Sequence, residues 1–346
     1  MKIRTIGLLI LSIMIQGCEK IYFPGEPDNS PVSNFNTFWK DFSNYYGQFD
    51  IRHINWDSVY VVYHSRINAG SSEQDLYNVF DEMIQLLKDG HVNLYTPIGV
   101  VGYNKLFPLN YSGNVLTGQD KYISFSQLQN SVITCGSVNS YDIGYVSIQT
   151  FHSNEFGKDD SRYNIIDDVI QLFKDKEGII IDVRGNNGGN SSNALNVAAR
   201  FADKKYLCYK QRYKIGPAKN DFSDWVNFDI SPRGKIQFTK PVVVLMSKYT
   251  FSAAELFVCA MSVFPNVKLV GDTTAGGLGD PVYRELMNGW SYRLSTSVGA
   301  MANGYIIDGK GIVPQFLVVT SQEDAKPENN RDPMLEKSIE VIVSSK

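Results

Sequence analysis

Cysteine is scarce in this sequence, and the few cysteines present lie far apart. The 346 residues contain four of them, at positions 18, 135, 208 and 259. A disulfide framework or a zinc knuckle needs more cysteines, or cysteines grouped closely along the chain. The sequence therefore predicts neither of these, and none of its motifs points to a metal ion or a cofactor.

A strong charge of one sign is also missing. The chain has 33 Lys and Arg against 36 Asp and Glu, a formal net charge of -3, and no basic block. Proteins that bind nucleic acid usually cluster Lys and Arg on one face, so we expect no nucleic-acid partner. A hydrophobic content of 43% with 20% charged residues is typical of a globular chain.

The apolar run near the N-terminus, Ile6 to Ile15, is too short to span a bilayer. Lys2 and Arg4 precede it, and Gly17-Cys18 follows it as in a bacterial lipobox. This pattern predicts a lipoprotein signal peptide over residues 1–17 and a lipid on Cys18. The expected location is the bacterial cell envelope, where the lipid would anchor the protein to a membrane.

The alternative for this segment is an ordinary secretory signal that happens to end near a cysteine. Residues 18–32 are polar and contain Pro24, Pro27 and Pro31. Their composition predicts a tether between the membrane and the folded domain.

Residues 33–95 are predicted to form an N-terminal helical region. Its clearest helix spans Gly70 to Gly90, with Ser71 and Gln74 as a capping box, apolar residues at helical spacing, and Gly90 as the stop. His91 follows immediately and opens a short strand. A histidine at such a junction can project into a cleft, although alone it is more often a surface residue at a turn.

Residues 96–140 carry short β-like runs, and we expect a small β subregion there, because the segment is too short for a complete peptide-binding PDZ module. Residues 141–346 then alternate strand and helix, with a polar excursion at 206–237. Such alternation predicts an α/β core with a parallel sheet and crossover helices. In these sheets the functional site lies beyond the carboxyl ends of the strands. The strands are expected at Ile143–Thr150, Gly178–Val183, Val242–Met246, Val267–Val270 and Trp290–Val298.

Ser252 lies where the buried strand Val242–Met246 turns into a helix. This position exposes a hydroxyl beside the N–H groups of a helix N-terminus, which suits a nucleophile. The Ala253 N–H could then hold an oxyanion. The structural alternative is plain capping, since Ser252 and Glu255 also have capping-box spacing.

The segment 184–190, Arg-Gly-Asn-Asn-Gly-Gly-Asn, follows another central strand. Its glycines allow N–H groups to turn toward a ligand. A phosphate-binding loop would need G-x-x-x-x-G-K-[ST] or G-x-G-x-x-G, and neither is present. An oxyanion loop that contributes the Gly188 N–H fits the sequence better.

Five stretches in order resemble the C-terminal (tail-specific) processing serine peptidases, and within them the tricorn-core branch. They are LLKDGHVNLY (86–95), IIIDVRGNNGG (179–189), PVVVLMSKYTFSAAE (241–255), VGDTTAGG (270–277) and DGKGIVPQ (308–315). The resemblance implies a crotonase/ClpP-like sheet, a peptide or unfolded protein as substrate, and no cofactor.

The resemblance also implies catalytic roles. Ser252 would attack the carbonyl, and the N–H groups of Ala253 and Gly188 would hold the oxyanion. One branch of the family uses a lysine as base, but Gly277 stands at that position. The tricorn-like branch uses a histidine and a carboxylate, which correspond to His91 and Asp308. Tricorn has a serine where Gly90 stands and a glutamate where Asp308 stands.

Two other functions are compatible with parts of this sequence. A catalytically silent peptide- or lipid-binding module would keep the same fold without using Ser252, His91 and Asp308. A crotonase-type acyl-CoA enzyme would share the sheet and an oxyanion loop, but coenzyme A is a cytoplasmic cofactor and the N-terminus predicts export. If His91 is the base with an unperturbed pKa, activity is expected to fall near pH about 6.5.

Overall fold

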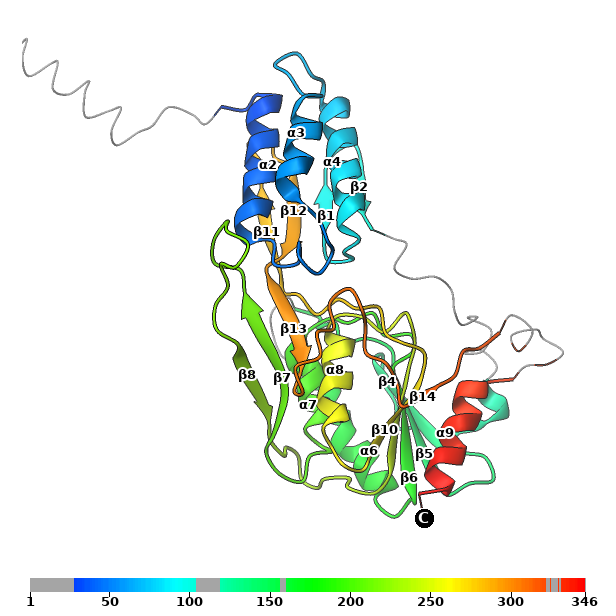
Figure 1. The fold of residues 1–346 in the computed structure, drawn as a ribbon. Helices are drawn as coiled ribbons and strands as arrows, with labels where there is room; N and C mark the ends of the chain where they lie inside the picture. The colour runs from blue at the N-terminus through cyan, green and yellow to red at the C-terminus, as the bar shows by residue number, and fades with distance from the viewer. Residues whose placement is uncertain are drawn as a thin grey trace, which may run out of the picture.

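The computed structural model describes residues 28–103, 119–155, 160–321, 324, 329 and 331–345. The predicted signal peptide, Cys18 and most of the predicted tether lie outside these residues. Figure 1 shows two parts, a smaller helical lobe above and an α/β core below. Within the described residues, no helix combines the length and the hydrophobicity that crossing a bilayer demands.

The α/β core is built on a seven-stranded sheet in the order β14-β10-β9-β6-β5-β4-β3. The strands from β14 to β5 run parallel, and β4 and β3 are antiparallel additions at one edge. This confirms the predicted parallel core with crossover helices. The strands are β3 (Ile123–Phe125), β4 (Ile133–Val138), β5 (Ile143–Ile148), β6 (Gly178–Asp182), β9 (Val242–Met246), β10 (Val267–Gly271) and β14 (Phe316–Leu317).

The central strands are buried on both faces, as their continuous apolar runs predicted. Along β6, Ile179 and Ile181 point into the core under three helices, and Ile180 points into the core under α9. The helices on the first face are α6 (Ile165–Phe173), α7 (Ser191–Ala198) and α8 (Ala253–Ser262), and α9 (Pro333–Val343) covers the other (Figure 1). A three-residue helix η2 (Gln119–Lys121) and a four-residue helix η3 (Ser161–Asn164) precede β3 and α6.

The helical lobe combines three N-terminal helices with a four-stranded sheet, β11-β12-β1-β2, which includes strands from much later in the chain. Its aromatic core is separate from those of the α/β part and includes Phe38, Phe80 and Trp290. The elements are α2 (Pro31–Tyr45), α3 (Trp56–His64), α4 (Glu73–Leu87), β1 (Asn93–Tyr95), β2 (Val100–Gly102), β11 (Pro281–Glu285) and β12 (Ser291–Ser295).

Four local predictions were wrong. In the described part of residues 96–140 the strands form no subregion of their own, because β2 joins the helical lobe while β3 and β4 extend the main sheet. The capping box of α4 is Ser72 with Asp75, not Ser71 with Gln74. That helix ends at Leu87, three residues before the predicted stop at Gly90, because Lys88 adopts a left-handed conformation with φ 50°.

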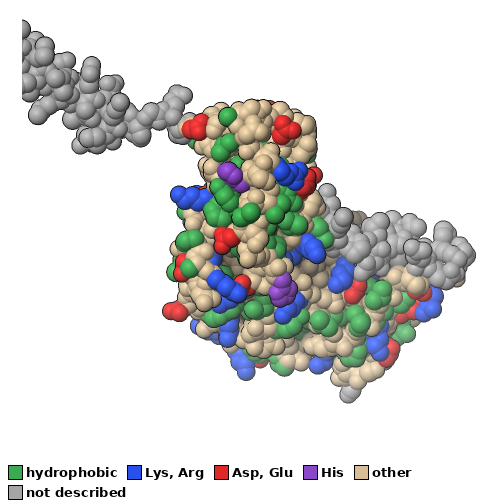
Figure 2. Space-filling view, turned by 45° about the horizontal axis from the view of Figure 1, so that its top comes forward, with side chains coloured by type: hydrophobic (Ala, Val, Ile, Leu, Met, Phe, Trp, Pro, Cys, Tyr) green, Lys and Arg blue, Asp and Glu red, His purple; other side chains and the backbone are tan. Residues whose placement is uncertain are grey.

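The fourth wrong prediction merged two strands into one, and two further strands were not predicted at all. The single strand expected at 290–298 is two strands in different sheets, β12 and β13 (Ser297–Met301). The polar excursion contains a hairpin, β7 (Tyr206–Tyr213) with β8 (Val226–Ile230), which pairs with β13. This sheet runs up the side of the molecule toward the helical lobe (Figure 1). Figure 2 shows acidic and basic side chains interspersed over the surface in view.

Candidate active site

Ser252 occupies a sharp turn between β9 and α8. It is the N-cap residue of α8, with φ 57° and ψ −125°, a conformation that L-residues rarely adopt. Strain of this kind persists only where the surrounding structure enforces it, and it is common at catalytic residues on strand–turn–helix elbows. The side chain is half-buried, so the hydroxyl remains within reach of a substrate.

His91 meets Ser252 from the other part of the molecule. The His91 Nε2 lies 2.9 Å from the Ser252 Oγ, although the two residues are 161 positions apart. A tight turn carries His91 between α4 and β1, where the Val92 N–H donates to the Asp89 carbonyl. The imidazole is buried and packs on Phe251, with 4.5 Å between ring centroids. The structure thus brings the two residues together as the sequence predicted.

The surroundings of His91 keep its ring neutral. Burial lowers the pKa of His91 to about 4; Arg293 and Arg52 add to this effect, and Asp89 opposes it. A neutral imidazole can accept the serine proton at neutral pH. Accepting it at Nε2 requires the tautomer that carries its own proton on Nδ1. The buried Nδ1 has no hydrogen-bond partner among the described residues.

Asp89 is the carboxylate that supports His91, and the sequence reasoning did not single it out. Its Oδ1 accepts the His91 backbone N–H at 2.9 Å. Its Oδ2 accepts from the Tyr46 hydroxyl at 3.1 Å and from the Ser295 hydroxyl at 2.8 Å. Burial pushes the pKa of Asp89 up, but the charge of Arg52 and these hydrogen bonds outweigh it and lower the pKa. Asp89 therefore supplies a negative charge beside the imidazole, and the D-G-H stretch was its signal.

Asp308 is not hydrogen-bonded to His91, which corrects the expectation that it orients the ring. Its Oδ1 accepts the backbone N–H groups of Leu278 at 2.7 Å and Gly279 at 2.9 Å. Its Oδ2 accepts the Gly299 N–H at 2.6 Å. Burial raises the pKa of Asp308 to about 7, against the opposing effect of these N–H donors. The carboxyl group is thus committed to holding the backbone.

The loop 276–279 is clamped by two buried carboxyl groups. Glu255 accepts the N–H groups of Gly276 and Gly277, each at 2.8 Å, and Asp308 accepts the next two along the chain. Glu255 also accepts the Ser252 N–H at 3.1 Å, so the same carboxyl group fixes the nucleophile's backbone. The clamp therefore ties the nucleophile elbow to the loop that faces it.

Gly277 shows why a lysine base does not fit at this position. A Cβ atom there would lie 2.1 Å from the Phe251 ring, which packs on His91. Any side chain would displace Phe251 and with it the imidazole. The position that one branch of the family gives to lysine is closed in this chain by an aromatic ring.

Replacing Asp308 by asparagine is expected to lower the free energy of unfolding by about 1–3 kcal/mol at neutral pH. The new amide nitrogen would face a backbone N–H and leave one of three donors without an acceptor. Urea unfolding of the variant measures this. Asp175→Asn is the control, since that residue is exposed and its carboxyl makes no hydrogen bond or ion pair with the described residues. A normal unfolding midpoint combined with a large loss of kcat would restore Asp308 to the role of orienting acid.

The loop 184–190 lies directly behind Ser252. A Cβ atom at Gly188, whose φ is +105°, would lie 2.7 Å from the Ser252 Cβ and 3.0 Å from the Ala253 nitrogen. Only glycine allows this approach. The Gly188 N–H, however, donates to the Asn186 Oδ1 at 2.9 Å. The prediction that it is a free oxyanion donor is therefore not met in this structure.

Ala253 is the better-placed oxyanion donor. It is the first residue of α8, and its N–H has no acceptor among the residues that the structure describes. The first N–H groups of a helix lack intrahelical partners and carry the positive end of the helix dipole. The arrangement thus offers a nucleophile, a neutral base and a backbone donor. In the described ranges, no group of three or more His, Cys, Asp or Glu could hold a metal ion.

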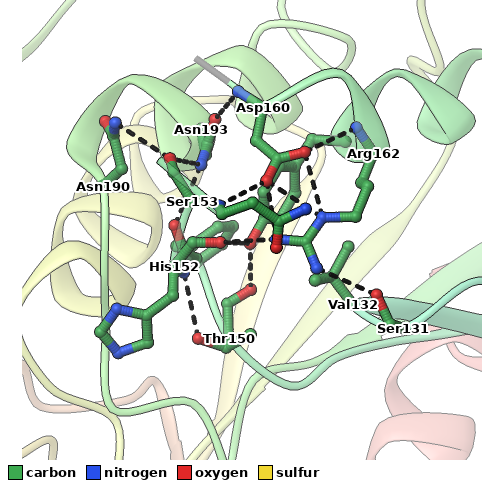
Figure 3. Close-up of polar contacts among 12 residues, drawn as sticks. Ser131, Val132, Thr150, His152, Ser153, Asp160, Arg162, Asn190 and Asn193 are labelled. Atoms are coloured by element: carbon green, nitrogen blue, oxygen red, sulfur yellow. Dashed lines mark hydrogen bonds and ion pairs between the residues drawn. The ribbon is translucent and has the colours of Figure 1, made fainter. Parts of the chain in front are cut away.

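A second network fixes the loop 184–190 from outside. The Phe151 N–H donates to the Gly188 carbonyl at 2.8 Å, and the Phe151 carbonyl accepts the Asn190 N–H at 2.9 Å. Figure 3 shows Asp160 and Arg162 facing each other beside this segment, and the His152 ring turned away from the network. Arg162 donates to the His152 carbonyl at 3.2 Å and pairs with Asp160 at 2.6 Å. The segment at 150–153 is therefore a rigid backing for the loop.

A serine on a parallel α/β core, a neutral histidine brought to it by the helical lobe, and a backbone donor beside the serine form the arrangement of a serine-type peptidase. The chain belongs to Peptidase family S41, whose model matches residues 142–318. The model of the Tricorn protease C1 domain matches residues 27–85, most of which lie in the helical lobe. Both matching models carry the names of peptidases.

Comparison with curated relatives covers only part of their length. The chain is 32% identical over 142 residues to the carboxy-terminal processing protease CtpA of Bacillus subtilis (strain 168), which is 41% of this chain and 28% of CtpA. It is 26% identical over 182 residues to CtpB of the same organism, 52% of this chain and 35% of CtpB. The matches thus span about a third of each relative.

Solved structures match over nearly the whole chain. A candidate peptidase from Parabacteroides merdae ATCC 43184 is 28% identical, with a TM-score of 0.82 over 92% of this chain and 98% of that one. Mature CPAF is 13% identical, with a TM-score of 0.71 over the same shares of the two chains. The second likeness is one of fold alone.

Proposed function

We propose that this chain hydrolyses peptide bonds in the bacterial cell envelope, with Ser252 as nucleophile and His91 as general base. The observation that carries the proposal is the 2.9 Å contact between Ser252 Oγ and His91 Nε2 at a strained strand–helix turn. A serine hydroxyl is a weak nucleophile, and a base within hydrogen-bond reach activates it.

The reaction would proceed through an acyl-enzyme. As Ser252 Oγ attacks the substrate carbonyl, its proton passes to His91 Nε2, and the Ala253 N–H stabilises the developing oxyanion. His91 then returns the proton to the leaving amine, and the C–N bond breaks. Water attacks the ester with His91 again as base, which frees Ser252. The negative charge of Asp89 favours the transient imidazolium.

Labelling with a fluorophosphonate tests this proposal against the rival function, a silent peptide- or lipid-binding module. The probe reacts with a serine only where a base activates it, so intact-mass analysis should find one adduct, on Ser252. Denatured protein should remain unlabelled. A native chain that takes up no probe, yet binds peptides, would support the binding module instead.

The pH profile should reflect the burial of His91. Because burial lowers the pKa of His91 to about 4, the neutral base is present throughout the weakly acidic range. Activity should be lost only as the pH falls through this lower value. Measured as kcat/KM against pH, the acid limb should lie well below the unperturbed histidine value of about 6.5. A limb at or above that value would mean that a solvated or carboxylate-paired histidine is the base.

We also propose that Cys18 carries lipid and holds the protein at a membrane. The support is the apolar segment that ends at Gly17-Cys18 behind two basic residues. Cys18→Ser should move the protein from the membrane to the soluble fraction after ultracentrifugation, with Cys135→Ser as the control, since that cysteine is buried in the core. Intact-mass analysis that finds an unmodified Cys18 in the wild type would contradict the anchor.

The proposal also covers where in its substrate the enzyme cleaves. The relatives CtpA and CtpB carry the name of carboxy-terminal processing proteases. We infer that this chain either trims the carboxyl ends of proteins or cleaves within unfolded ones. Mass spectrometry of products from one unfolded substrate, with and without a C-terminal extension, distinguishes the two.

A further inference from the structure

A cavity lies between the helical lobe and the β7–β8 hairpin, and the proposed mechanism does not use it. It encloses about 320 Å³. One wall comes from the turn after α2 and carries Phe49, Ile54 and Trp56; the other comes from β7 and the loop that follows and carries Arg212, Lys214 and Phe222. This volume is at the small end of the range for small-molecule sites, about 300–1,000 Å³.

Arg212 is the most unusual group in this cavity. Its guanidinium stacks on Phe222, 4.4 Å from the ring centroid, and lies 5.1 Å from the ring of Trp225. Its Nε is buried without a hydrogen-bond partner, and no carboxylate pairs with it among the described residues. Arginine is always charged and presents five donors, so a buried donor without an acceptor is costly. Because the Nε has almost no accessible surface, an oxyanion in the cavity would instead bind the two terminal nitrogens of the guanidinium, which have no acceptor among the described residues.

Lys214 adds a second cation on the same wall. It is 8% exposed, its ammonium group lies 5.1 Å from the Phe222 ring, and it donates to the Ala218 carbonyl. Burial lowers the pKa of Lys214, and the charges of Asp221 and Asp50 oppose this. A bound anion would favour the charged ammonium.

The acidic residues of the cavity limit the charge of its ligand. Asp50 and Asp57 also line it, and Asp50 pairs with Lys219 at 3.2 Å. Arg212 and Lys214 then lie near two acids, Asp57 on the cavity lining and Asp221, whose charge acts on Lys214. A dianion such as phosphate would therefore meet more repulsion than a single carboxylate. The aromatic wall opposite favours an apolar group on the same ligand.

We propose that this cavity binds the carboxylate of a ligand that also carries an aromatic or branched apolar group. The carboxylate bridges Arg212 and Lys214, and the apolar group packs against Phe49 and Trp56. The ligand is either a small free acid or the C-terminal residue of a peptide, which share this chemistry. The proposal goes beyond peptide hydrolysis, because binding here needs neither Ser252 nor His91.

Calorimetric titration of the full chain carrying Ser252→Ala tests the proposal without turnover, so its result is independent of the proposed hydrolysis. The probes are N-acetyl-phenylalanine and N-acetyl-phenylalaninamide, which differ only in the carboxylate. The acid should bind at least about tenfold more tightly than the amide, since a charge-assisted hydrogen bond is lost. Equal affinities would overturn the proposal.

Variants locate the binding site. Arg212→Gln and Lys214→Met should each lower the affinity for N-acetyl-phenylalanine by about ten- to a hundredfold. Lys235→Gln, which removes an exposed cation elsewhere, should leave this affinity unchanged. Far-UV circular dichroism checks each fold, and Lys214→Met keeps the test valid if Arg212→Gln is unstable. Unchanged affinity in the folded variants would refute the site. A six-residue peptide ending in phenylalanine then separates the sources: tighter binding than the free acid identifies a chain end, and weaker binding a small acid.

Discussion

Replacing Ser252 by alanine is expected to lower kcat for peptide hydrolysis by about a millionfold while leaving the fold intact. The hydroxyl is the group that attacks, and Ser252 Oγ makes its hydrogen bond to His91 Nε2 and not to the core. Its backbone N–H remains held by Glu255 in the variant. Turnover of a fluorogenic peptide by the purified variant measures the loss.

Ser262→Ala is the matched control, because Ser262 ends the same helix and its hydroxyl donates to the Cys259 carbonyl at 2.7 Å. It should retain full activity. Thermal unfolding of both variants separates lost chemistry from lost structure. Normal turnover by folded Ser252→Ala would refute the serine mechanism altogether.

Replacing His91 by alanine is expected to cost nearly as much, again about a millionfold in kcat, because the serine loses the base that contacts its hydroxyl. The two losses should not add, since nucleophile and base act as a unit. The double variant should therefore be no slower than either single variant in the same peptide assay.

His53→Asn is the control for this prediction. His53 is exposed and has a φ of 56°, a conformation that asparagine tolerates well. Its activity should match the wild type. If His91→Ala keeps most of its kcat, a lysine such as Lys248 becomes the candidate base. Losses that multiply in the double variant would show that the two residues act in separate steps.

The elements that could be predicted from the sequence are those whose signal is local. The runs of β6 and β9 are continuously apolar because both faces of each strand are buried, and that pattern is visible in a few residues. Ser252 was found in the same way, from a strand that breaks into a helix. The meeting of His91 with Ser252 is nonlocal, and only the ordered resemblance to a family made it predictable.

The errors arose where distant contacts decide. Asp308 was assigned to His91, but its three N–H partners come from two other segments, and no local pattern indicates which donors a carboxylate will meet. The strand expected at 290–298 divides between two sheets, a choice made by pairing partners that are remote in sequence. Asp89 was overlooked because it acts through a backbone N–H and through the hydroxyls of Tyr46 and Ser295.

Ser252 and His91 are rooted in separate hydrophobic cores, one in the α/β part and one in the helical lobe. A chain in which only one core has folded holds either an unactivated serine or a histidine with nothing to activate. The proposed hydrolytic activity therefore requires that both cores have folded. The C-terminal half supplies β11 and β12 to the lobe that carries His91, so the sheet beside His91 is complete only with residues up to 295 in place. The proposed peptidase would therefore be inactive for as long as its own chain is unfolded.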